Sequence, residues 1–237
     1  MISEGEFHAA LNAGETLLNR CGLLRERNAY NRRRLGAAEL GGLDYVSMWE
    51  RLISANDYDI RLMDDSVMLF WRSTDGLTLR YCWFESPRSL PPFDEYARAY
   101  LGDVLQGDMD VNDIDQLLSE CEFEIQQAFE EERKSAALRD AVTPLRYEFS
   151  PRDYTEGVHP ASHLHVGISN EIRFACRRML NPMSFVLLVM RQAYPELWLQ
   201  HLRNLIASEH ANHVRERLPI VSSEHWNELD DCEMRFE

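Results

Sequence analysis

Lysine is almost missing from this chain of 237 residues, because Lys134 is the only one and arginine supplies the other basic residues. GC-rich coding explains such a bias as readily as phosphate binding does. The five cysteines are scattered, odd in number and form no C-x-x-C pair. Their pattern argues against a disulfide framework and against a zinc site built on thiolates.

Long apolar runs are also lacking. The longest, from Phe185 to Met190, is far too short to span a bilayer. The acidic N-terminus, from Met1 to Glu6, has no apolar core and therefore does not resemble a signal peptide. We expect a cytoplasmic protein that makes no contact with a membrane.

Complete catalytic motifs are absent as well. The sequence has no Walker A loop, no G-x-G-x-x-G and no G-x-S-x-G, so nucleotide binding and serine hydrolysis have no support. The missing motifs leave open whether the protein is an enzyme.

The charges that are present are unevenly placed. The formal net charge is -15, and eleven acidic residues with no basic one lie between Asp103 and Glu132. An acidic surface disfavours nucleic acid, whose phosphates bind lysine and arginine. Arg32, Arg33 and Arg34 form a local basic stretch through which nucleic acid would bind, unless a partner protein binds it instead.

Hydrophobic periodicity predicts an α+β fold, with an antiparallel sheet of about five strands covered by helices. A long acidic amphipathic helix, expected from Asn112 to about Ala141, separates two groups of strands. Ser3 with Glu6 and Asn181 with Pro182 are typical helix starts. We expect one domain over residues 1–237, made of an N-terminal helical and loop region (1–56), a strand group (58–86), an acidic helical insertion (92–141), and a second strand group with C-terminal helices (144–237).

Three of the eight histidines lie within seven residues, at His159, His163 and His165. Alternate side chains of a strand share a face, so His163 and His165 would point the same way. Such a pair binds a divalent metal, or one ring acts as a general base, and His159 would fold back to join it. Glu148 and Asp153 are nearby carboxylates. The alternative is architectural, with the imidazoles bonded to backbone groups in a packed turn.

Arg173 follows the histidine pair and adds a guanidinium. Two imidazoles beside a guanidinium have the composition of a phosphate site, and also of an ordinary strand paired with Glu148. The candidate catalytic residues are therefore His163, His165 and Arg173. The candidate ligands of a divalent metal are His159, His163 and His165.

The acidic segment is the candidate surface for a basic protein partner. Its lack of a central glycine and of a properly placed final glutamate argues against a calcium loop. The residues expected to contact the partner are Asp113, Asp115, Glu120, Glu124 and Glu131.

The strand Arg146 to Phe149, the segment His159 to His165 and the helix start at Pro182 resemble a bacterial family of unknown function, DUF2290. The resemblance covers mainly residues 144–198, and Met183-Ser184-Phe185 departs from the family's helix-start pattern. It implies no established activity. Because proteins of this family look like cargo of mobile elements and defence islands, the resemblance implies a role beside other gene products.

Two functions remain as hypotheses. The first is a non-catalytic interaction or regulatory subunit of a bacterial multi-protein system, in phage defence or toxin neutralisation, whose protein partner is encoded nearby. The second is a histidine-centred nuclease or phosphodiesterase, either metal-dependent or working by acid/base catalysis. The first is favoured because the acidic asymmetry is strong and no catalytic motif is complete.

Overall fold

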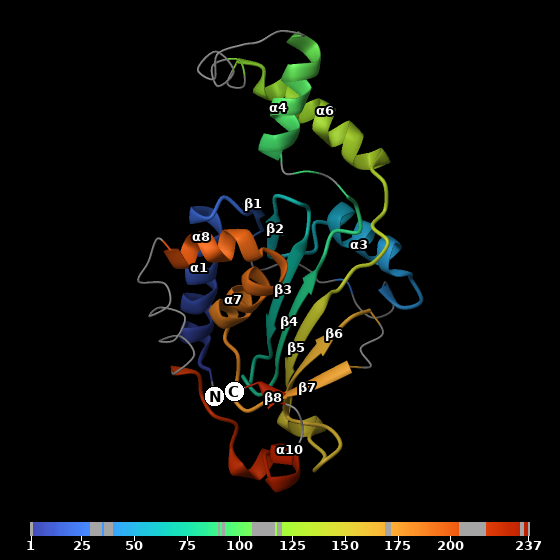
Figure 1. Ribbon diagram of the computed structural model, residues 1–237. Coiled ribbons are helices and arrows are strands. Elements are labelled where there is room, and N and C mark those ends of the chain that lie inside the picture. Colours follow the sequence, from blue (N-terminus) through green and yellow to red (C-terminus); the bar gives the residue numbers. More distant parts are fainter. Residues whose placement is uncertain are drawn as a thin grey trace.

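The computed structural model describes residues 2–28, 35, 40–89, 91, 93–105, 117, 120–168, 172–203, 217–232 and 235–236. Within them, seven α-helices accompany one open sheet of eight strands, which lie side by side in chain order (Figure 1). The first seven strands are antiparallel to their neighbours, and the eighth runs parallel to the seventh. The α+β prediction is confirmed. No helix in this part of the chain has the length and apolar character needed to cross a membrane.

The strands are β1 (Leu24–Arg27), β2 (Ile60–Leu62), β3 (Val67–Arg72), β4 (Leu79–Phe84), β5 (Leu145–Phe149), β6 (Ser162–Val166), β7 (Ile172–Cys176) and β8 (Arg235–Phe236). The α-helices are α1 (Glu4–Arg20), α3 (Tyr45–Ser54), α4 (Phe93–Leu105), α6 (Glu122–Ser135), α7 (Pro182–Ala193), α8 (Pro195–Arg203) and α10 (Glu228–Cys232). Two short 3-10 turns, Pro151–Asp153 and Ser223–His225, complete the elements.

The expected number of about five strands is wrong, because β1, β6 and β8 were not counted. β1 is made of Leu24 and three charged residues, so it shows no apolar alternation. It forms because backbone bonding to β2 does not depend on side chains, and because its charges are paired: Arg27 Nε lies 2.7 Å from Glu15 Oε1. β6 lies in the histidine segment, for which a packed turn was the alternative to a strand. Its five residues pair with both β5 and β7.

The single long acidic helix expected from Asn112 to Ala141 is also wrong. α6 begins at Glu122 and ends at Ser135, and residues 111–116, 118 and 119 lie outside the described part of the chain. After Ser135 the backbone bonds to another segment: Ser89 N donates to Ala137 O at 2.9 Å, and Arg139 N donates to Pro87 O at 2.8 Å. We call these paired segments, residues 87–89 and 137–139, the neck.

Beyond the neck, α4 and α6 form a two-helix arm that projects from the sheet (Figure 1). The arm has its own small core, built on Ala97, Leu101 and Ile125. The aromatic ring of Phe129 also packs on Phe93, with ring centroids 5.4 Å apart. The acidic insertion is therefore a helical hairpin with its own apolar contacts.

One buried carboxylate links the arm to the sheet. The Asp65 side chain, in the β2–β3 turn, is 3% exposed and accepts from Arg61 Nε at 2.7 Å and from Arg25 Nη1 at 3.2 Å. Arg133 of α6 reaches the other oxygen at 2.8 Å. Glu130 of α6 pairs with Arg25 and, at 2.5 Å, with Arg133. A buried carboxylate needs such partners, because its charge is costly to desolvate.

α1 and α7 pack together over one face of the sheet (Figure 1). Both expected helix starts are present: Ser3 and Glu6 form a capping box, as do Asn181 and Ser184. The side chains beneath the helices include the fully buried Tyr81 and Tyr147, whose rings lie 5.3 Å apart. The main hydrophobic core of the molecule therefore lies on this face.

On the second face, α3 covers only one end of the sheet. Trp49 and Leu52 of α3 pack with Tyr58 and Val67 in a separate cluster. Beyond that cluster, the second face carries the outward residues of β4 to β7, which are mostly polar. The candidate functional site lies there.

Gly14 allows α1 to approach α7, and this contact gives a prediction. A Cβ atom at Gly14 would lie 2.9 Å from Cγ2 of the buried Val186. We expect Gly14→Ala to lower the free energy of unfolding by about 1 kcal/mol, because overpacking outweighs the gain in helix propensity. Chemical denaturation measures it. Gly5→Ala is the matched control, since nothing lies within 4 Å of a Cβ there and no loss is expected. A stabilised Gly14→Ala protein would contradict this packing.

Candidate functional site: the histidine face of the sheet

Strand register brings the polar residues of the second face into two rows. The first row runs across β3 to β6 and consists of the successive cross-strand neighbours Trp71, Arg80, Glu148 and His163. In the second row, the neighbours on β4 to β7 are Cys82, Arg146, His165 and Arg173. Opposite residues of an antiparallel pair have Cβ atoms about 5 Å apart, so side chains within each row are in reach of one another.

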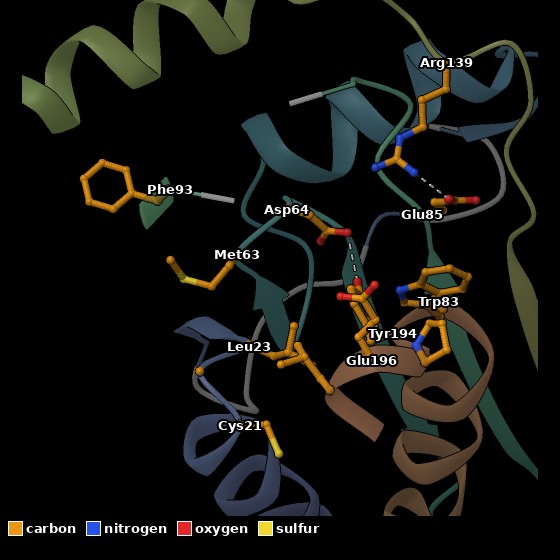
Figure 2. Close-up of a pocket in the computed structure, with 14 residues that line it drawn as sticks. Cys21, Leu23, Met63, Asp64, Trp83, Glu85, Phe93, Arg139, Tyr194 and Glu196 are labelled. Carbon is orange, nitrogen blue, oxygen red and sulfur yellow. Dashed lines mark hydrogen bonds and ion pairs between the residues drawn. The ribbon is translucent and has the colours of Figure 1, made fainter. Parts of the chain in front are cut away.

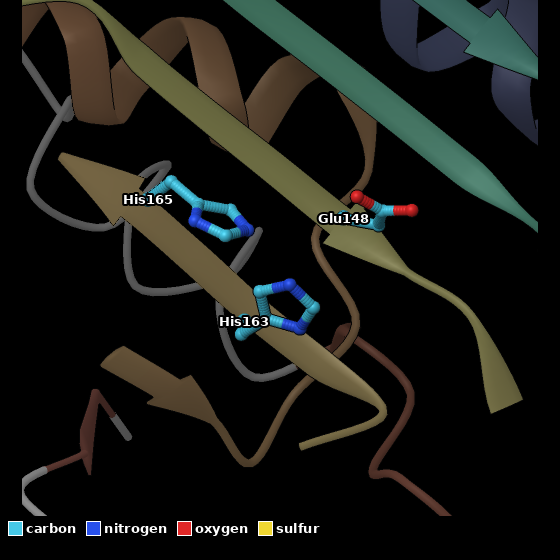
Figure 3. A group of neighbouring side chains, drawn as sticks. All are labelled: Glu148, His163 and His165. Atoms are coloured by element: carbon cyan, nitrogen blue, oxygen red, sulfur yellow. The ribbon is translucent and has the colours of Figure 1, made fainter. Parts of the chain in front are cut away.

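Glu148, His163 and His165 gather on this side of β5 and β6 (Figure 3). One ligand atom of each lies within 4.8 Å of the others, and both histidines are buried. The two imidazole centroids are 4.7 Å apart with the ring planes nearly perpendicular. His159 completes the aromatic contacts, because its ring lies 4.8 Å from that of His163.

His163 is fixed as a neutral acceptor. Its Nδ1 lies 2.8 Å from the carbonyl oxygen of Pro160, so Nδ1 carries the proton and donates it. Burial lowers the pKa of His163 to about 4, and the hydrogen bond to Pro160 opposes this only in part. Nε2 therefore presents a lone pair, and it is buried with no hydrogen-bond partner. A buried acceptor without a partner is uncommon and indicates a missing ligand or proton donor.

Arginines surround the other two members. Nε and Nη2 of Arg80 both lie 2.9 Å from Oε1 of Glu148. Arg146 Nη2 lies 3.0 Å from Nε2 of His165 and 4.0 Å from Oε2 of Glu148. Because a guanidinium only donates, Nε2 of His165 is an acceptor here. The face thus combines neutral imidazole, one carboxylate and positive charge.

The cluster would hold a metal only after a small contraction. Zinc bound at about 2.1 Å brings neighbouring ligand atoms to about 3.4 Å, which is closer than the present spread. The carbonyl of Pro160 already orients His163 in the way that backbone carbonyls orient metal-binding histidines. Arg146, however, occupies Nε2 of His165, so a metal would take that nitrogen only if the guanidinium moved.

The residues expected at the site are distributed as follows. His163 and His165 share a face, and His159 contacts His163 but lies outside the tightest group. Arg173 is the register partner of His165 on β7 and is exposed. Asp153 is not part of the cluster, because its carboxylate accepts from the Ser150 hydroxyl at 2.6 Å.

Sequence reasoning missed Arg80 and Arg146. Both alternate with buried core residues of β4 and β5, so their positions on the polar face were readable from period two. Their proximity to the histidines was not readable, because it depends on the order of the strands. Of the expected partner-binding residues, Glu120, Glu124 and Glu131 are exposed, while Asp113, Asp115 and the basic stretch Arg32, Arg33 and Arg34 lie outside the described residues.

Comparison with known proteins identifies the family. The family model described as "Uncharacterized conserved protein (DUF2290)" matches residues 25–227, so the chain belongs to this family. The match confirms the resemblance and extends it well beyond residues 144–198. No curated protein and no solved structure matches the chain.

The buried neutral state of His163 predicts a pH dependence of stability. Its folded pKa of about 4 lies below the unfolded value near 6.5, so the unfolded chain takes up the proton first as pH falls. The contribution to stability is complete above pH ~6.5 and is lost toward pH ~4, by up to about 3 kcal/mol. We expect His163→Asn to remove this component in denaturation curves of metal-free protein. Parallel curves for the two proteins over that range would show that His163 is not the group involved.

Proposed function

We propose that this protein is a non-catalytic interaction or regulatory subunit that binds a basic protein partner through its helical arm. The supporting observation is Phe123 of α6, whose side chain is 76% exposed. Its neighbours Glu122 and Glu124 are exposed too. Ile125 and Phe129 of the same helix are buried and already supply the apolar face of the arm.

An aromatic side chain at such a position suits a protein interface. Large aromatic residues contribute most of the binding energy where they enter an apolar pocket on the partner. Acidic residues around that anchor steer a partner of opposite charge and set its orientation. The partner that fits has an apolar pocket bordered by lysine or arginine.

We propose that this protein belongs to a bacterial multi-protein system that acts in phage defence or toxin neutralisation. The gene for its partner lies beside its own gene. A toxin or a nucleic-acid-binding enzyme with a basic surface would fit the charge of the arm. Because the arm projects from the sheet, binding through it leaves the histidine face on β5 and β6 open for a separate role (Figure 1).

The arm gives a prediction for complex formation. Phe123→Ser should weaken binding to a co-expressed neighbouring gene product by at least about tenfold, because an interface anchor is worth about 2 kcal/mol or more. Reversing Glu122 and Glu124 to lysine should slow association and flatten its salt dependence. Surface plasmon resonance at two salt concentrations measures both effects.

Val158→Ser is the matched control, because Val158 is 70% exposed but lies in the turn before β6. This variant should bind as the wild type does. The proposal fails if Phe123→Ser and Val158→Ser bind the partner equally well.

A second candidate function rests on the unpartnered Nε2 of His163: a metal-dependent or acid/base phosphodiesterase. His163, His165 and Glu148 would hold the metal, which acts as a Lewis acid on a phosphoryl oxygen. Arg80 and Arg146 beside them, with Arg173 in the next strand, would bind the phosphate.

This candidate predicts metal binding that depends on His163. We expect a transition metal near one equivalent in the wild type by mass spectrometry after dialysis against zinc or manganese, and a loss of it in His163→Ala. Cleavage of RNA or DNA should disappear in the same variant while its melting temperature stays within a few degrees. His8→Ala, which changes a partly exposed histidine of α1, is the control. Equal loss of folding and activity would instead assign the histidines an architectural role.

A further inference from the structure

A cavity of about 830 Å³ lies where the neck meets the sheet (Figure 2). Its walls come from segments far apart in sequence: the end of α1, the β2–β3 turn, the end of β4, the start of α4, the neck and the α7–α8 junction. Cavities of 300–1,000 Å³ hold most drug-sized ligands. This one is separate from the histidine face, because none of its lining residues belongs to β5, β6 or β7.

Negative charge predominates in the lining. It contains three carboxylates, Asp64, Glu85 and Glu196, against one guanidinium, Arg139, which leaves a net charge of -2. Arg139 is already neutralised, because its Nη1 lies 2.9 Å from Glu85 Oε1. Glu196 is exposed and forms no hydrogen bond or ion pair with any described residue.

Hydrogen bonds hold the carboxylate of Asp64 in place. Its Oδ2 accepts from the Tyr194 hydroxyl at 2.9 Å, and its Oδ1 accepts from the backbone N–H of Ser66 at 2.9 Å. Burial raises the pKa of Tyr194 far above its ordinary value, so the phenol stays protonated and keeps donating to Asp64. The carboxylate thus keeps a fixed orientation in the cavity wall.

The remaining walls are aromatic and aliphatic. Trp83, Tyr194 and Phe93 come from three different elements, and Met63 and Leu23 lie between them (Figure 2). Trp83 is only 4% exposed, and among the described residues its indole N–H has only the nearby Tyr194 hydroxyl as an acceptor, in poor geometry. A ligand with an acceptor atom would give this donor a better partner.

We propose that this cavity binds an organic cation, an amine or guanidinium carried on an apolar body that also has an acceptor atom. Aromatic faces attract such cations, and carboxylates add charge and hydrogen bonds. An anion would be repelled by the net negative charge of the lining. A bare metal ion would leave the aromatic walls unused and would find Asp64 and Glu85 already hydrogen-bonded.

The bound cation can belong to a free small molecule or to an arginine or lysine side chain of a protein. This inference is independent of the arm's partner, because Phe123 is not among the lining residues. The cavity does include Phe93 and Arg139, which belong to the two chain segments that lead into and out of the arm. A bound cation would therefore contact both the sheet and the base of the arm.

Calorimetric titration of the full chain tests the proposal with agmatine, spermidine, N-acetylarginine methylamide and an arginine-rich octapeptide. The citrulline analogue of the third probe has the same shape without the charge. We expect one cation per chain, at least about tenfold weaker binding of the citrulline analogue, and about fivefold weaker binding to Glu196→Gln. Glu156→Gln, an exposed carboxylate outside the cavity, should bind as the wild type does.

Binding of free agmatine or spermidine would support the small-molecule source, and binding of the octapeptide alone would support the protein source. Either result supports recognition of the cation if Glu196→Gln weakens it. The proposal is overturned if no cation binds with a Kd below about 1 mM, or if the citrulline analogue binds as tightly. Equal affinities of Glu196→Gln and Glu156→Gln would also overturn it, provided that both variants melt at the wild-type temperature.

Discussion

The antiparallel pairing of β5 with β6 determines the character of both faces of the sheet. It sets Tyr147 opposite Leu164 on the core side and Glu148 opposite His163 on the other side. A slip of one residue would exchange the two sets and would bury Arg146 and Glu148 beneath α7. Tyr147 opposes such a slip, because its buried hydroxyl bonds the Ser162 hydroxyl at 3.0 Å and accepts the Leu180 N–H at 3.0 Å. The histidine cluster thus depends on contacts made on the opposite face.

The two ends of the second face are organised differently. At one end, the Asp65 network joins β1, β2 and α6 through charged pairs. At the other, neutral imidazoles lie among arginines. The histidine end is therefore suited to phosphate or a metal, whereas the cavity, which is lined partly by the α7–α8 junction, is suited to positive groups. The proposals for the cavity and the histidine face follow from these different charges, whereas the proposal for the arm rests on the exposed Phe123.

Local features of the fold were predictable from the sequence to a large extent. The capping boxes at Ser3 and Asn181 depend on neighbouring residues alone, and both helices begin where those residues indicate. The hairpin of β3 and β4 was equally readable, because an Asp-Gly pair, here Asp75-Gly76, is a typical hairpin turn, and Gly76 takes φ +70 there. β1 was not predictable, because its charged residues form a strand only through their partners. The end of α6 was not predictable either, because the neck pairs Arg88 with Leu138, 50 residues further along the chain.

The sequence by itself determined the α+β class, the family, the histidine pair and the acidity of the insertion, because each is a property of residues close together in the chain. The tertiary structure decided that Arg80, Arg146 and Glu148 surround the histidines, because strand order and register bring them from β4 and β5. It also decided that Phe123 is left exposed and that Trp83, Tyr194 and Glu196 line one cavity. Such neighbours meet only after the chain has folded, since no local pattern encodes contacts between distant segments.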